Sequence, residues 1–198
     1  EVGHTLGLPH NMGSSVAYPV DSLRSKSFTE KYGTAPSIMD YARFNYIAQP
    51  GDEGVALMPD IGVYDKYAIQ WGYKPILNTT AEEEKSTLDK WIMAHSGDPL
   101  YRFGHQQVGD IVDPSSQTED LGDDAIKAGE YGIANLKRIV PKLIEWTAED
   151  GKNYDDLNKL YGQVFSQFNR YMGHVSNNIG GVYENHKTYD QEVAVYTA

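Results

Sequence analysis

The first ten residues constrain this chain more than any later segment. Glu1 and His4 are three residues apart and therefore lie on one face if this segment is helical. Gly7 favours a turn at the end of that helix, because glycine accepts a positive φ without a Cβ clash. The chain can then swing back through the rigid Pro9 so that His10 faces the same point. Two imidazoles and a carboxylate that converge in this way favour a metal site with a base beside it.

From Glu1 onward, this spacing has the form of the extended zinc-peptidase motif H-E-x-x-H-x-x-G-x-x-H. We expect the first histidine of the motif directly before Glu1, so that the chain begins inside an active-site helix. Three protein ligands leave the fourth position of Zn²⁺ open for water, as a catalytic zinc site requires. Zn²⁺ lowers the pKa of that water towards neutrality, and Glu1 can take its proton. The sequence therefore predicts Zn²⁺ as cofactor, His4 and His10 as ligands, and Glu1 as general base.

A second segment, from Ser37 to Tyr41, resembles the Met-turn of the metzincins. In that clan the methionine forms an apolar floor beneath the zinc ligands. In groups such as the astacins and serralysins, a tyrosine two places later reaches the metal or the developing oxyanion. The resemblance implies that Met39 is the floor and that Tyr41 stabilises the transition state. Without the zinc motif, Met39 would be interpreted as a gap-filling core residue and Tyr41 as a half-buried surface aromatic.

The residue after His10, the third histidine of the motif, indicates which group of metzincins the chain resembles. It is Asn11 here, where matrixins typically carry Ser, astacins Glu, adamalysins Asp and serralysins Pro. The chain is instead similar to a poorly characterised bacterial family of met-zincin metalloproteases that is common in cell-envelope proteins. The similar sequence segments are residues 10–12, 61–73, 120–124 and 131–137. This resemblance implies a secreted, periplasmic or cell-envelope protein whose targeting segment lies outside this chain.

The same resemblance implies a zinc-dependent endopeptidase that acts on a protein or peptide substrate. We expect its N-terminal subdomain, with the sheet edge that pairs with extended substrate, to lie upstream, and we expect the isolated chain to be inactive. The alternative is a non-catalytic binding or scaffolding module with an unused zinc site. A simpler alternative still is a glycine-capped helix with two unrelated histidines. Retention of Glu1 favours catalysis, because a metal site kept only for structure needs no general base.

Charge and hydropathy exclude some classes of partner. The net charge of −11 argues against a surface for nucleic acid or for anionic membranes. No stretch approaches the roughly 18 consecutive apolar residues of a transmembrane helix. The chain has no cysteine, so it has no disulfides, and redox chemistry does not identify its compartment.

Hydrophobic periodicity predicts a mainly α chain, and the resemblance implies the C-terminal subdomain of a zincin with irregular loops. We expect one unit over residues 1–198, with the active-site segments in 1–60 and a helical part in 61–198. Serine, glycine and proline in residues 12–36 predict a long surface loop between the third ligand and the Met-turn. Such a loop could border the substrate cleft.

Four helical segments are predicted in the second part: residues 61–72, a helix capped by Thr80, residues 124–149 with a break at Pro141, and residues 155–178. Weak alternation over residues 182–197 predicts a short terminal strand or hairpin.

Two further groups of polar residues have both a functional and a structural interpretation. Aspartates in the loop 110–124 offer the oxygen ligands that Ca²⁺ prefers, but they lack the spacing of an EF-hand. We favour capping of the following helix by Asp123 or Asp124. The remaining histidines show no paired spacing and are interpreted as surface or hydrogen-bonded residues: His95, His105, His174 and His186.

Overall fold

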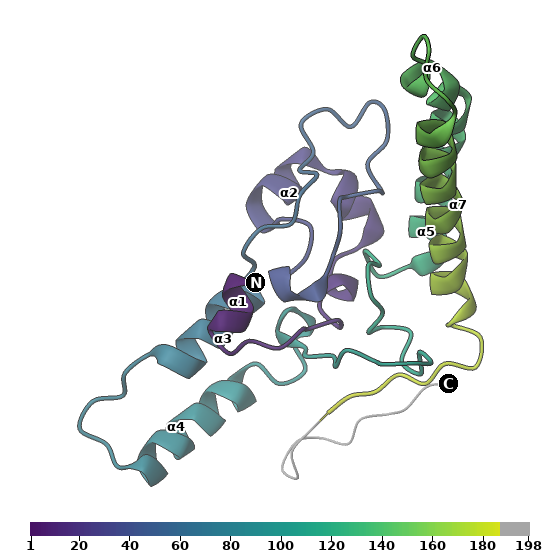
Figure 1. Ribbon diagram of the computed structural model, residues 1–198. Coiled ribbons are helices and arrows are strands. Elements are labelled where there is room, and N and C mark those ends of the chain that lie inside the picture. Colours follow the sequence, from purple (N-terminus) through teal and green to yellow (C-terminus); the bar gives the residue numbers. More distant parts are fainter. Residues whose placement is uncertain (187–198) are drawn as a thin grey trace.

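The computed structural model describes residues 1–186, which are largely helical and contain no strand. The mainly α prediction is therefore confirmed. Figure 1 shows a central body, an arm and a hairpin. The arm consists of α3 (Val63–Tyr73) and α4 (Ala81–Ala94), and the hairpin of α5 (Ala125–Ile139), α6 (Leu143–Thr147) and α7 (Asp155–Ser176). Most of the strand or hairpin predicted at 182–197 lies outside the described residues, and residues 182–186 are not in a strand.

The central body is built from short helices joined by turns. These are α1 (Val2–Thr5), α2 (Lys26–Tyr32) and the 3₁₀ helices η1 (Ser15–Ala17), η2 (Val20–Arg24) and η3 (Ile38–Asp40); a further 3₁₀ turn, η4 (Pro99–Tyr101), follows the arm. The hydrophobic core lies in this body, where Leu23 and Ile47 are fully buried. Leu121 and Ala128 join the same cluster, so the core extends to the start of the hairpin.

The prediction of a surface loop over residues 12–36 is wrong. This segment contains η1, η2 and α2, and it supplies core residues such as Met12 and Leu23. Its small residues allow close packing, since a Cβ on Gly13 would lie 2.9 Å from the backbone of Gly104. Serine, glycine and proline are also the usual residues of loops, so their abundance hid the apolar positions between them.

The longer helices begin and end where their local sequences predict. Thr80 forms a capping box with Glu83 at the start of α4, and the side chain of Asp124 caps α5. Pro141 splits the long predicted helix into α5 and α6, with the 3₁₀ turn η5 (Val140–Lys142) between them. The predictions of capping by Thr80, of capping by Asp123 or Asp124 and of a break at Pro141 are confirmed, and Asp124 is the second of these caps.

The hairpin packs closely where Gly132 of α5 faces Tyr171 of α7. A Cβ on Gly132 would collide with the ring of Tyr171, which is buried and whose centroid lies 4.7 Å from that of Tyr46 in the central body. We expect Gly132→Ala to lower the free energy of unfolding by about 1–3 kcal/mol, the usual cost of overpacking. The matched control is Gly162→Ala on α7, where a Cβ meets no atom within 4 Å.

Gly162→Ala is expected to raise the free energy of unfolding by about 0.5–1 kcal/mol, because alanine replaces glycine inside a helix. Urea unfolding of both variants measures the contrast. Equal effects of the two substitutions would contradict this packing.

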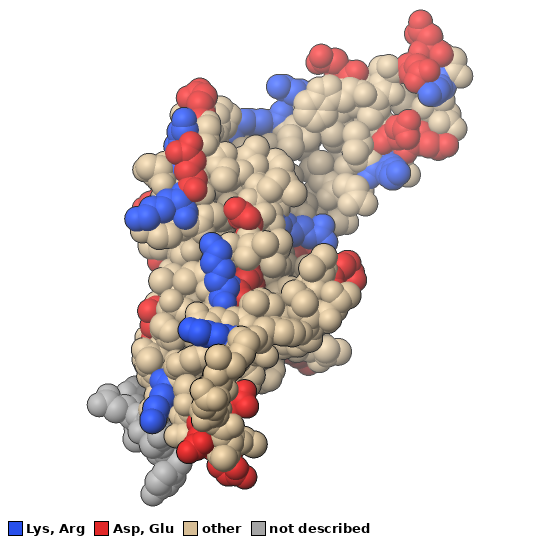
Figure 2. Space-filling model, turned by 90° about the vertical axis from the view of Figure 1, so that its left-hand side faces the viewer, with Lys and Arg blue, Asp and Glu red and all other residues tan. Residues whose placement is uncertain are grey.

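None of the helices within residues 1–186 is long and apolar enough to cross a membrane. On the face shown in Figure 2, lysine and arginine side chains are scattered among acidic ones, with wide neutral surface between them. Charges of both signs are thus interspersed on this face and are not gathered into one patch.

Candidate active site

The structure brings the two predicted ligands together. His4 lies in α1, and the chain turns after it at Gly7, whose φ is +80°. The ring centroids of His4 and His10 are 4.5 Å apart in an edge-to-face arrangement. His4 is exposed and His10 is partly buried, so the pair borders the solvent.

Backbone carbonyls fix the orientation of both imidazoles. His4 Nδ1 lies 2.9 Å from the carbonyl oxygen of Leu8, and His10 Nδ1 lies 3.3 Å from that of Met39. A carbonyl oxygen only accepts hydrogen bonds, so each Nδ1 carries the proton and donates it. In the neutral imidazole Nε2 then keeps its lone pair, which is the form of histidine that binds a metal ion. The donor chemistry of the pair therefore fits Zn²⁺.

Met39 lies directly against the helix that carries His4. A Cβ on Gly3 would collide with the Sδ atom of Met39, so the close approach requires glycine at this position. Met39 is only 6% exposed. Its carbonyl oxygen lies within reach of His10 Nδ1 and accepts a 3.0 Å hydrogen bond from Asn11 N. Met39 thus contacts both segments that carry the predicted ligands.

Tyr41 lies beside His10, with ring centroids 4.2 Å apart, and its side chain is about half exposed. It follows η3 with φ 55° and ψ 18°, which is the left-handed region. This conformation costs a non-glycine residue of order 1–3 kcal/mol and persists where the surrounding structure fixes it. Here it accompanies the contact between the tyrosine ring and His10.

Asp65 holds the turn that presents Met39, a role that the sequence did not reveal. The Asp65 carboxylate accepts hydrogen bonds from Ser37 Oγ at 2.6 Å, Ile38 N at 2.8 Å and Gly62 N at 2.8 Å. Asp65 is buried in the first turn of α3. An acidic residue at the third position of a helix was an available signal for the bond to Gly62 N, which is the N-cap. The bonds to Ser37 and Ile38 had no local signal.

Asn11 ties the segment after His10 to a distant part of the chain. Its Nδ2 donates to the carbonyl oxygen of Arg102 and its Oδ1 accepts from Gly104 N, both at 2.9 Å. The side chain is fully buried. In the sequence Asn11 distinguished families, whereas its partners, 91 and 93 residues later, could not be identified from spacing.

Glu1 precedes the first residue of α1 and is exposed. Within residues 1–186 there is no group of three His, Cys, Asp or Glu side chains that could hold a metal ion.

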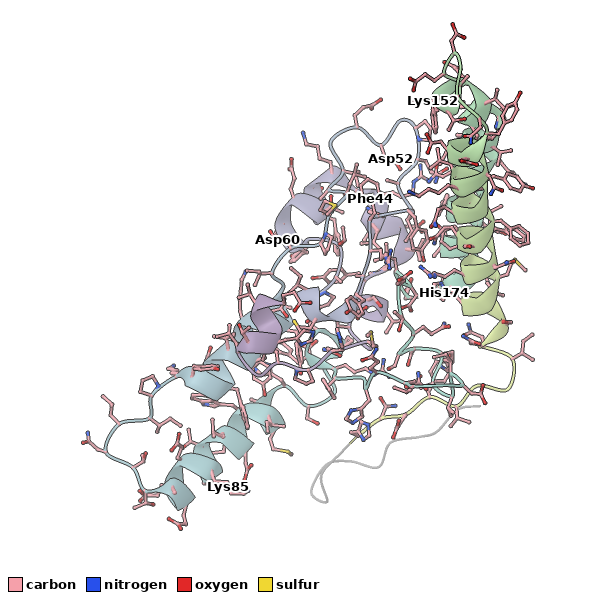
Figure 3. All side chains as sticks on the ribbon, viewed as in Figure 1. Phe44, Asp52, Asp60, Lys85, Lys152 and His174 are labelled. Atoms are coloured by element: carbon pink, nitrogen blue, oxygen red, sulfur yellow. The ribbon has the colours of Figure 1, made fainter. Side chains whose placement is uncertain are left out.

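The remaining histidines have structural contacts. His174, on the side of α7 that faces the central body (Figure 3), hydrogen-bonds through Nε2 to Thr118 O at 3.0 Å, and burial lowers its pKa. His95 stacks on Tyr101. The ring centroids of His105 and His186 lie 4.8 Å apart.

Three aspartates of the loop 110–124 have separate structural partners. Asp113 forms an ion pair with Arg102 at 2.9 Å, Asp123 accepts a hydrogen bond from Val20 N, and Asp124 caps α5. From the sequence we favoured capping by Asp123 or Asp124, and Asp124 is the residue that caps the helix.

The whole chain, residues 1–198, matches the family model described as Met-zincin. Neither the curated proteins nor the solved structures give a match. The family points to a domain of the zinc metalloprotease type, which is the chemistry that the His4 and His10 pair fits. The chain belongs to the Met-zincin family.

Proposed function

We propose that this chain carries the zinc-binding and catalytic residues of a metalloendopeptidase. The observation that carries the proposal is the orientation of His4 and His10. Both Nδ1 protons are held by backbone carbonyls, so that two Nε2 lone pairs are available on adjacent rings. Membership of the Met-zincin family supports the same chemistry at a coarser level.

A third protein ligand is needed to complete a catalytic zinc site. Residues 1–186 hold no group of three suitable side chains. We propose that the third ligand is a histidine encoded directly before Glu1, as the motif requires. Bound Zn²⁺ would act as a Lewis acid on the peptide carbonyl and would make water acidic enough to ionise near neutral pH.

The residues of this chain then have distinct tasks. Glu1 takes a proton from the attacking water and passes it to the leaving amine. Tyr41, beside His10, donates its hydroxyl hydrogen to the carbonyl oxygen as negative charge develops there. Met39, packed against Gly3 and bonded through its carbonyl to His10, keeps the two ligand segments at a fixed spacing.

The substrate class is a protein or peptide, and the place of action is the cell envelope or the medium outside the cell. Both parts of this proposal rest on the family resemblance. If the protein were a binding or scaffolding module instead, zinc would be bound without any peptide cleavage.

The ligand assignment is tested by zinc content and cleavage of a generic protein substrate. The protein used is this chain extended by the residues encoded before Glu1. His10→Ala removes one ligand, and we expect it to weaken zinc binding by about 10²-fold or more, since loss of second-shell partners alone costs 10–100-fold. Elemental analysis after dialysis, together with an activity assay, measures both losses.

The matched control is His105→Ala, an exposed histidine that the motif does not include. It is expected to keep both zinc and activity. Full zinc content in His10→Ala would refute the ligand assignment, and zinc without cleavage in the unsubstituted protein would favour the scaffolding module.

A further inference from the structure

Seven buried side-chain oxygen atoms in the described part of the chain have no hydrogen-bond partner, and four of them belong to residues that influence one another. These four are Asp40 Oδ1, Asp120 Oδ1, Ser14 Oγ and Ser15 Oγ. Asp40 and both serines are fully buried, and Asp120 is 4% exposed. A buried polar atom without a partner destabilises the folded state, so four of them in one region require a physical explanation.

These side chains come from three separate segments that lie close together, since the backbone N–H groups of Ser14 and Ser15 bond to Asp40, and the charge of Asp120 raises the pKa of Asp40. The Ser14 side chain lies close enough to Asp40, and that of Ser15 close enough to Asp120, to favour the charged form of each carboxyl, although neither serine hydroxyl completes a hydrogen bond. The net shift of the pKa is nevertheless upward for both carboxyl groups. Burial, followed by the charge of Asp120, raises the pKa of Asp40, and burial raises the pKa of Asp120.

Backbone hydrogen bonds hold one of these carboxyl groups in place. Asp40 Oδ2 accepts from Ser14 N at 2.8 Å and from Ser15 N at 2.7 Å. The second oxygen, Oδ1, is therefore fixed in position but has no donor of its own. An acceptor that is held rigidly and left without a donor is suited to a cation.

The basic residues nearby already have other partners. The charge of Arg102 acts to lower the pKa of Asp120. The guanidinium group of Arg102, however, binds the Asp113 carboxylate at 2.9 Å and the carbonyl oxygen of Ser115 at 3.0 Å. Among the described residues, neither Asp40 nor Asp120 forms an ion pair with lysine or arginine. Two buried carboxyl groups thus share one region without a positive charge of their own.

We propose that Asp40, Asp120, Ser14 and Ser15 form a binding site for Ca²⁺ that is separate from the predicted zinc site. Ca²⁺ takes about six to eight oxygen ligands, which carboxylates, neutral oxygens and water supply together. The group contains no nitrogen or sulfur donor, and oxygen ligands suit Ca²⁺ better than softer metals. Of the loop aspartates considered from the sequence, this site uses Asp120 alone.

Ca²⁺ at this position would connect three segments around the candidate active site. Asp40 directly follows Met39, the two serines follow the His10 segment, and Asp120 precedes the hairpin. The expected effect of Ca²⁺ is therefore on the stability of the body that supports His10.

Calcium binding to the 198-residue chain tests the proposal. The protein carries His4→Ala and His10→Ala, so that the predicted zinc ligands cannot take up the ion. After removal of metals, we expect isothermal titration to show one Ca²⁺ bound per chain. The unfolding temperature should rise with Ca²⁺ concentration and should not rise with Na⁺ at equal ionic strength.

Two substitutions in this background locate the site. Asp120→Asn removes one of the two charged ligands, and we expect it to weaken calcium binding by about tenfold or more, because ligand charge tunes calcium affinity. The matched control, Asp110→Asn, changes an exposed aspartate of the same loop and is expected to leave calcium binding unchanged.

Three outcomes would overturn the proposal. The first is an unfolding temperature that does not respond to Ca²⁺, together with an Asp120→Asn variant that is more stable at neutral pH, which would mean that the carboxyl groups share a proton instead. The second is equal calcium affinity in Asp120→Asn and Asp110→Asn. If Asp120→Asn does not fold, Ser15→Ala replaces it, and undiminished calcium binding by that variant is the third.

Discussion

Glu1→Ala is expected to lower kcat of the zinc-loaded, upstream-extended protein by about 10²–10⁴-fold, the usual contribution of a general base. Zinc content is expected to stay unchanged, because the imidazoles of His4 and His10 are oriented by the carbonyls of Leu8 and Met39 and not by Glu1. Peptide hydrolysis under saturating substrate and elemental analysis of the same samples give both quantities.

The matched control is Glu53→Ala, which removes an exposed glutamate from a loop. It is expected to retain full activity. A Glu1→Ala protein that loses its zinc together with its activity would show that Glu1 has a structural role and would refute its assignment as the base.

Asp65→Ala is expected to lower the free energy of unfolding by about 3 kcal/mol or more. The substitution leaves the hydroxyl of Ser37 and the backbone N–H groups of Ile38 and Gly62 without their acceptor. Each buried group that loses its partner costs about 1–3 kcal/mol. Urea unfolding measures the loss, and the turn that carries Met39 is expected to be the region most affected.

Asp60→Ala is the control for this substitution. Asp60, labelled in Figure 3, is exposed, and its side chain accepts a hydrogen bond from the adjacent Ile61 N. A change within about 0.5 kcal/mol is expected for such a surface position. If Asp65→Ala were no less stable than Asp60→Ala, Asp65 would not be the anchor of the turn.

The features that could be predicted from the sequence depend on residues close together in the chain. A helix cap needs only three or four residues, so the caps at Thr80 and Asp124 could be identified, as could the break at Pro141. The turn at Gly7, which brings His10 to His4, has the same local character. The spacing of residues in the sequence is therefore enough to predict short-range geometry.

The features that could not be predicted depend on contacts between distant segments. The core role of residues 12–36 arises because Gly13 lies against Gly104, and the anchor of the Met39 turn is Asp65. Neither contact leaves a periodic signal in the sequence. Loop-like composition therefore led to the wrong prediction for a segment in which 12 of 25 residues are buried.

The hydrogen bonds of Asn11 to Arg102 and Gly104 also affect the order in which the chain folds during synthesis. The partners of Asn11 are translated only 91 and 93 residues after it. At about 5–20 residues per second, this interval lasts roughly 5–20 seconds. The side chain of Asn11 therefore lacks these partners until residues 102 and 104 have been synthesised, and the segment after His10 completes its hydrogen bonds only then.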